Sequence, residues 1–127
     1  MFVGVGRLVI QIPGATTIKE RRRVVKSFKD RLRAKLPLSV AEVGDTERLQ
    51  VATFGMAVVS NDTARCHEVL AAALSMARVL PDAVLCDVRT EIVPFGAGGK
   101  SLGPGIEQAL DTEPFEQGTP EDWDEND

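Results

Sequence analysis

Apolar and polar positions divide the first 93 residues of the chain into six segments. Apolar side chains alternate with polar ones along residues 2–12 and 83–93, which predicts two half-buried strands. Residues 38–43 predict a short strand, and the mostly apolar run of residues 49–60 predicts a central strand. Along residues 18–36 and 63–80 the apolar spacing is three and four, which predicts two helices. Pro37 and Pro81 end these helices, since proline lacks the N–H that continues one.

The predicted order is strand-helix-strand-strand-helix-strand, which is that of the ferredoxin-like fold. We therefore expect one α+β domain over residues 1–95, with a four-stranded antiparallel sheet. Each helix has one apolar stripe to bury, so both should cover the same face of the sheet. The opposite face would stay open, and Val3, Val5 and Val9 would form an apolar patch there that suits a homodimer.

The first helix has a clear start signal and a clear apolar side. Thr17 followed by Glu20 is a capping box, in which the threonine hydroxyl accepts from the Glu20 N–H and the carboxylate reaches back. The stripe of this helix consists of Val25, Phe28, Leu32 and Leu36. In the last strand, alternation predicts an inward row made of Val84, Cys86, Val88 and Ile92.

The composition changes near Pro94. Residues 96–127 are first rich in Gly and Pro and then acidic, which predicts a mostly disordered tail. Residues 1–100 carry 15 basic and 10 acidic groups, a net charge of +5, whereas residues 101–127 carry nine acidic groups and no Lys or Arg, a net charge of −9. Such segregation is typical of chains with a nucleic-acid partner or an interaction tail.

The chain contains no apolar run long enough for a membrane span, and we read no signal peptide at its start. We therefore expect a cytoplasmic protein. Its two cysteines, Cys66 and Cys86, are interpreted as buried thiols of a reducing compartment, and His67 as a surface residue.

Nine of the fifteen Lys and Arg residues fall within Ile18–Lys35. Five of them recur at spacings of three and four and so form one row along the helix. Like charges at these spacings repel, and a polyanion such as the phosphates of RNA would neutralise them. The alternative interpretation is a solvated helix face, partly paired with the acidic tail. The candidate nucleic-acid-binding residues are Lys19, Arg21, Arg22, Lys26, Lys29 and Arg33.

Other motifs lack parts that their chemistry requires. The segment GAGGKS (96–101) has Pro94 where a phosphate-binding loop needs its first glycine, and no full helix follows it. Cys66, His67 and Cys86 offer no complete metal-ligand set, so no metal or cofactor is expected.

Three carboxylates, Glu42, Asp45 and Glu47, flank a hairpin and are interpreted as solubilising groups. No convergent pair of titratable groups is visible, and we expect no enzyme. Phe54 is interpreted as a core residue, so contact with RNA would be made chiefly through phosphates.

Three ordered motifs resemble the YlxP-like family, a small bacterial family of unknown function. They are PGATTIKERRRVVK (13–26), SVAEV (39–43) and VSND (59–62). The resemblance covers about residues 1–93 and implies a ferredoxin-like fold, without an established activity. Genes of that family commonly lie near genes for translation initiation and ribosome maturation, which implies a ribosomal connection. Leu49 and Val51 depart from the family, which often has an aromatic and a basic residue in this segment.

The patterns and the resemblance together indicate a non-enzymatic RNA- or ribosome-associated factor. The alternative is a dimeric protein-interaction or assembly module with no nucleic-acid partner. No membrane contact and no small-molecule substrate are indicated. The acidic tail would compete for the cations of the first helix and weaken non-specific binding.

Overall fold

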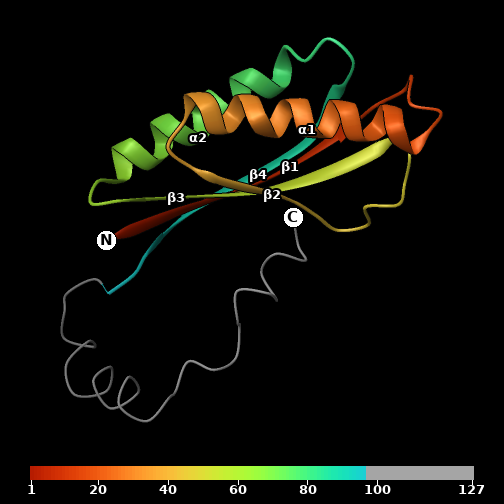
Figure 1. Cartoon of the computed structure of the whole chain (residues 1–127). Helices are drawn as coiled ribbons and strands as arrows, with labels where there is room; N and C mark the ends of the chain where they lie inside the picture. Colours follow the sequence, from red (N-terminus) through yellow and green to blue (C-terminus); the bar gives the residue numbers. More distant parts are fainter. Residues whose placement is uncertain (97–127) are drawn as a thin grey trace. The chain divides into compact units, whose positions relative to one another are not determined.

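The computed structural model describes residues 1–96 of the chain. Its folded unit, Met1–Pro94, contains β1 (Phe2–Gln11), α1 (Ile18–Lys35), β2 (Ser39–Val43), β3 (Val51–Ser60), α2 (Thr63–Arg78) and β4 (Val84–Pro94). The four strands form one antiparallel sheet in the order β2-β3-β1-β4, and both helices lie on one face of it (Figure 1). The predicted ferredoxin-like fold is confirmed. The predicted tail, except for Gly96, lies outside the described residues.

Helix α1 begins and packs as its sequence predicts. The Glu20 N–H donates to the Thr17 hydroxyl at 3.1 Å, and the Thr17 N–H donates to the Glu20 carboxylate at 3.1 Å, so the capping box is present. The side of α1 that faces the sheet buries Phe28, whose ring meets Phe54 of β3 edge to face at 5.1 Å between centroids. The two rings therefore fix α1 over the sheet.

Strand β4 departs from strict alternation at Cys86. Along the pairing of β1 with β4, Val9 lies opposite Asp87 and Ile10 lies opposite Leu85, so Cys86 has no residue opposite it. One extra residue of this kind is a β-bulge, which re-aims the side chains next to it.

The bulge makes part of the predicted inward row wrong. Val84 and Cys86 are exposed, and Leu85 is half-buried in their place, packed against the core. Beyond the bulge, Val88 and Ile92 are half-buried and pack against the core, as predicted. The interpretation of Cys86 as a buried thiol is therefore also wrong, whereas Cys66 is buried.

Two glycines of β1 allow α2 to approach the sheet closely. A Cβ atom added to Gly4 would lie 2.9 Å from Cγ1 of Val58 and 3.2 Å from Cβ of Cys66. A Cβ atom added to Gly6 would lie 3.0 Å from the terminal methyl of Met56, which is the end of a flexible side chain. The space above Gly4 is therefore the more rigid of the two.

We expect Gly4→Ala to lower the free energy of unfolding by about 1–3 kcal/mol, because the new methyl overpacks a rigid contact. Gly6→Ala is the matched control and should cost clearly less, because the Met56 methyl can move aside. Urea denaturation followed by circular dichroism measures both. Equal midpoints for the two variants would contradict the close approach of α2 at Gly4.

Candidate nucleic-acid interface

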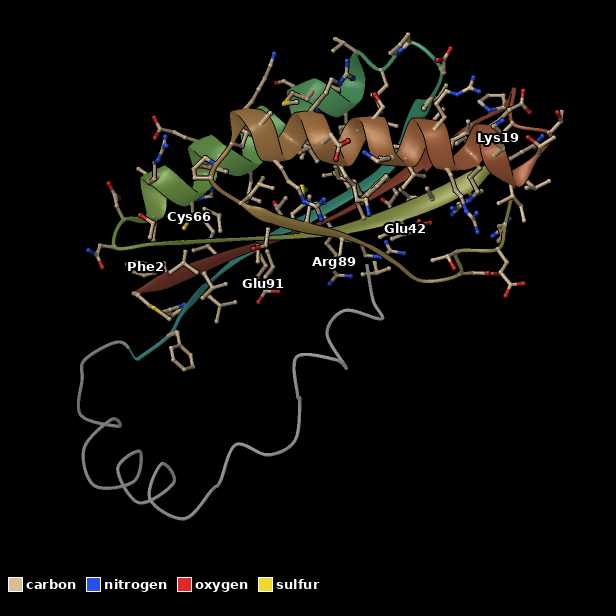
Figure 2. All side chains as sticks on the ribbon, viewed as in Figure 1. Phe2, Lys19, Glu42, Cys66, Arg89 and Glu91 are labelled. Atoms are coloured by element: carbon tan, nitrogen blue, oxygen red, sulfur yellow. The ribbon has the colours of Figure 1, made fainter. Side chains whose placement is uncertain are left out.

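The predicted row of cations occupies one flank of α1. Lys19, Arg22, Lys26 and Arg33 are exposed, and Lys29 is half-exposed. Consecutive members are three or four residues apart, so they follow one another at about 4.5–6 Å along the helix axis. Figure 2 shows Lys19 at the start of the helix. The row is a continuous line of positive charge on the surface of the domain.

Two members of the row also contact the domain itself. The Lys26 ammonium lies 2.7 Å from the Asp30 carboxylate, and its side chain remains 76% exposed. The hydrogen bond from Lys26 lowers the pKa of Asp30, so this carboxylate stays charged at neutral pH. An exposed pair one helical turn apart is weak and is screened by salt. Lys26 can therefore exchange Asp30 for another anion.

Arg33 shows which way the row faces. Its Nη2 donates to the carbonyl oxygen of Val40 in β2 at 2.9 Å. Because β2 is an edge strand of the sheet, the row lies on the outer flank of α1, away from α2. A long polyanion could follow this flank without meeting the second helix.

Arg21 does not belong to this surface. Its side chain is 3% exposed, and its guanidinium group donates to the Glu42 carboxylate in β2 and to the backbone oxygens of Arg48 and Val51, the last at 3.0 Å. All these acceptors lie in the domain beneath α1. The expectation that Arg21 contacts phosphates is therefore wrong, because its donors are already used inside the fold.

The end of β2 explains why a guanidinium is needed there. Strand β2 ends at Val43, opposite Thr53, and Gly44 then turns away with a φ of +81°. Strand β3 begins at Val51, two residues later than predicted, and on its β2 side no strand residue remains beside Val51. Arg21 donates to the carbonyl that β2 leaves unpaired. The interpretation of Glu42 as a solubilising carboxylate is also wrong, since it is the partner of this buried cation.

A sequence signal for Arg21 exists in hindsight. The buried residues of α1 are Arg21, Val25, Phe28 and Leu32, at spacings of four, three and four. Arg21 continues the apolar stripe by one turn toward the helix start, whereas the row of exposed cations lies beside the stripe. The periodicity that identifies the stripe thus separates this buried arginine from its neighbours.

The N-terminal end of α1 is closed to an external anion by Glu20. Its carboxylate accepts hydrogen bonds from the backbone and hydroxyl groups of both Thr16 and Thr17. The Thr16 backbone bond is the largest cause of a lowered pKa at Glu20, so the carboxylate is charged at neutral pH. This negative charge disfavours an external anion at the helix start, which leaves the lysine and arginine side chains as the cationic groups of α1.

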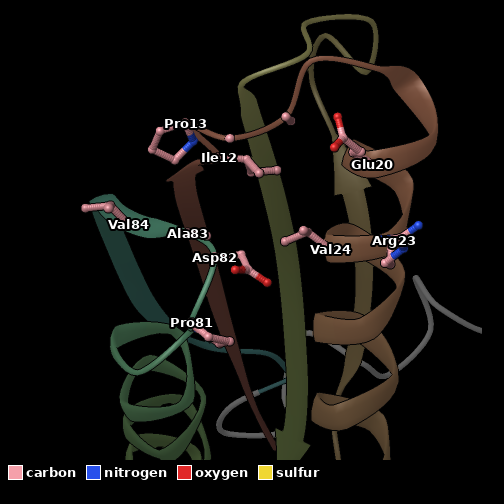
Figure 3. A pocket seen from close by; sticks show the side chains of 11 residues that line it. Ile12, Pro13, Glu20, Arg23, Val24, Pro81, Asp82, Ala83 and Val84 are labelled. Carbon is pink, nitrogen blue, oxygen red and sulfur yellow. The ribbon is translucent and has the colours of Figure 1, made fainter.

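A cleft of about 470 Å³ lies between the first turns of α1 and the loop from α2 to β4 (Figure 3). Ile12, Ala15 and Val24 supply apolar lining, and Glu20, Arg23 and Asp82 supply the charged groups. The Glu20 carboxylate is engaged in the capping box through its Oε1 atom. The cleft therefore combines apolar lining with charged groups, one of which already has partners in the helix cap.

The remaining candidates from the sequence stay apart or lie outside the described residues. Among residues 1–96, no three His, Cys, Asp or Glu side chains come together as metal ligands. His67 is exposed, and Phe54 is fully buried on the helix-covered face of the sheet. The GAGGKS segment lies outside the described part of the chain except for Gly96. Neither described helix has the length and hydropathy of a membrane span.

Comparisons with known proteins place the chain among proteins without an assigned activity. A family model described as "Protein of unknown function (DUF503)" matches residues 3–90. No curated protein matches the chain.

Solved structures with similar folds include two designed proteins and one putative enzyme. The designed protein Foldit4 is 12% identical, with a TM-score of 0.46, and the match covers 75% of this chain and 99% of that one. The designed protein LFR1, described as having a ferredoxin fold, is 11% identical, with a TM-score of 0.42 and coverage of 77% and 89%. A putative chlorite dismutase is 13% identical, with a TM-score of 0.45; the match covers 90% of this chain and 54% of that protein.

Proposed function

The chain belongs to the DUF503 family of proteins of unknown function, and we propose that it is a non-enzymatic RNA- or ribosome-associated factor. The exposed cations of α1 would hold the phosphates. Within this proposal the chain is a YlxP-like member of the family and acts in the cytoplasm, where ribosomes are found. The proposal rests chiefly on one observation, the row of Lys19, Arg22, Lys26, Lys29 and Arg33 along a single flank of α1.

The charge balance of the row favours a polyanion as partner. Within Ile18–Lys35 only Glu20 and Asp30 are acidic, and Glu20 is engaged in capping the helix. The cations of the row therefore repel one another with little compensation inside the protein. Phosphates of a nucleic acid would remove this repulsion, and the release of their counterions would add a favourable, salt-dependent term to binding.

The way in which α1 is fixed to the sheet supports the same proposal. Phe28 packs against Phe54 of β3, and Arg21 ties the first turns of the helix to β2 and to the start of β3. A helix held at both places presents its exposed side chains in a fixed register. Less conformational entropy is then lost when several of them engage phosphates together.

A second candidate function is favoured by the open face of the sheet. Small and apolar residues lie along this face on β2, β3 and β1. Val5, Val43 and Val59 are exposed there, as is Val93 of β4 beside Val3. A dimeric protein-interaction module with no nucleic-acid partner would use this face. Its contacts would include the exposed valines of this face, so its affinity would depend less steeply on salt than phosphate binding does.

We expect binding to a fluorescently labelled polyuridine RNA to weaken steeply as salt rises. Five cations on five phosphates give a slope of about −3.5 in log K against log salt concentration, at about −0.7 per phosphate of a single strand. Arg22→Gln combined with Lys29→Gln should reduce the size of the slope by about 1.4, because two phosphate contacts are lost. Fluorescence anisotropy at a series of salt concentrations gives both slopes.

Arg65→Gln combined with Arg78→Gln is the matched control, because it removes the same charge from exposed positions of α2. This variant should keep the slope of the wild type. Equal losses in both double variants would show a response to net charge alone and would contradict the proposed surface. Affinity that does not depend on salt would favour the protein-interaction module.

A further inference from the structure

The sheet face opposite the helices carries two neighbouring rows of residues that differ in character. The first row runs across the strands as Ser39, Ala57, Val5 and Glu91, and the second as Ala41, Gly55, Arg7 and Arg89. On β2 and β3 both rows consist of small residues, which leave the backbone open to close approach. On β4 the first row ends in an anion and the second in a cation.

The charges at the β4 end of these rows are incompletely paired within one molecule. Arg7 and Arg89 lie directly opposite each other on adjacent strands, where like charges repel. Arg7 has an ion-pair partner in Asp87, at 3.3 Å, whereas Arg89 and Glu91 have none among residues 1–96. Figure 2 shows Arg89 and Glu91 on the side of the sheet away from the helices.

We propose that this open face binds a second copy of the chain through a two-fold axis that crosses the strands between the two rows. Such an axis places each row over the other row of the partner. Arg89 then meets Glu91 of the other copy, and Glu91 meets the other copy's Arg89. Two ion pairs form, and neither charge has a competing partner in its own described domain.

The small residues fit the same arrangement. The axis lays Gly55 over Ala57 of the other copy, and Ala41 over the other copy's Ser39. Along β2 and β3 the two sheets can therefore pack closely without large side chains between them. Two sheets packed face to face are the arrangement of β-sandwiches, in which the interior is formed by their inner faces. The exposed Val5 and Val43 would be covered.

A nucleic acid is a poorer occupant of this face. The charged residues there are Arg7 and Arg89 with Asp87 and Glu91, which sum to zero. The strand residues of the open face include no aromatic side chain on which a base could stack, because Phe54 points under the helices. A suitable partner carries both cations and anions, spaced to match those of this face. A second copy of the chain has this arrangement.

The area of the sheet face determines the affinity that we expect for the dimer. Four strands about 4.8 Å apart and nine residues at about 3.3 Å each give a flat area of roughly 500–600 Å² per copy. This is below the area of about 800 Å² that a standard interface buries on each partner. The dimer should therefore dissociate on dilution. In it, both α1 helices face outward, so the dimer would carry two rows of cations on opposite sides.

Sedimentation equilibrium of the full chain over a range of concentrations tests the proposal. We expect a concentration-dependent dimer for the wild type. Arg89→Glu alone and Glu91→Arg alone should each raise the dissociation constant at least tenfold, by an estimate of about 1.4 kcal/mol or more for like charges brought together. Arg89→Glu combined with Glu91→Arg should restore it to within about threefold of the wild type, because the pairs re-form with reversed polarity.

Arg65→Glu is the matched control for charge, since Arg65 is exposed on α2 and not on the sheet. It should leave the dissociation constant unchanged. A wild type that stays monomeric at every concentration would overturn the proposal. A dimer that responds equally to Arg65→Glu and Arg89→Glu, or that the double exchange does not restore, would overturn the proposed register.

Discussion

Replacing Arg21 with alanine is expected to lower the free energy of unfolding by about 3–5 kcal/mol, the usual cost of removing one partner from a buried ion pair. The loss has two causes. The Glu42 carboxylate, whose side chain is only 14% exposed, loses its ion-pair partner, and the backbone oxygens of Arg48 and Val51 lose their donor. Buried polar groups without partners are costly. Guanidinium chloride denaturation, followed by circular dichroism in the far ultraviolet, measures the change in the free energy of unfolding.

The neighbouring residue provides the control. Arg22 has the same charge and lies on the exposed row, so Arg22→Ala should change the free energy of unfolding by no more than about 0.5 kcal/mol. Arg21→Lys keeps the charge and loses the planar fork of donors, and its stability should fall between those of the wild type and Arg21→Ala. A stability of Arg21→Ala equal to that of Arg22→Ala would contradict the structural role of Arg21.

Reversing three charges of the row, with Lys19→Glu, Arg22→Glu and Lys26→Glu in one variant, should reduce RNA affinity by at least about 100-fold at low salt, because three attractive phosphate contacts become repulsive. The measurement is a pull-down from bacterial lysate with the full chain as bait. The wild type should retain ribosomal RNA, and the variant should lose it. Nuclease treatment before capture should abolish the difference between them.

The matched control changes the same amount of charge elsewhere. Arg31, Arg65 and Arg78 are exposed and lie off the row, so Arg31→Glu with Arg65→Glu and Arg78→Glu should still retain RNA. Partners that survive nuclease in both variants would identify a protein contact and favour the interaction module. Loss of RNA in the control as well would mean that net charge, not the row, determines binding.

The parts of this fold that depend on short-range patterns could be predicted from the sequence. Apolar spacing located both helices, and the capping box between Thr17 and Glu20 involves residues only three apart. The prediction of a mostly disordered tail over residues 96–127 rested on composition alone, and except for Gly96 it lies outside the described residues. The fold class followed from the number of elements and their order along the chain, because few topologies accommodate two helices with one apolar stripe each.

The parts that failed depend on partners far away in the chain. Arg21 and Arg22 are both arginines in a basic segment, and only Glu42 and the end of β2 determine that one is buried. Cys86 was placed inward by alternation, but the bulge arises from how β4 pairs with β1 and leaves no mark in the local pattern. The cation row could be identified from spacing, because it requires only the period of one helix. That Arg89 and Glu91 end two adjacent rows of the open face can be seen only once the strand register is known.

Arg33 has a consequence for the behaviour of the protein in concentrated solution. Its guanidinium covers the outward carbonyl of Val40 on β2, and this strand is only five residues long. An exposed edge strand is where foreign strands attach and begin fibril growth. A foreign strand that pairs with β2 must first displace this arginine. Because β2 is short, it offers few backbone hydrogen bonds in exchange. The helix that carries the positive row thereby also protects the rim of the sheet from polymerisation.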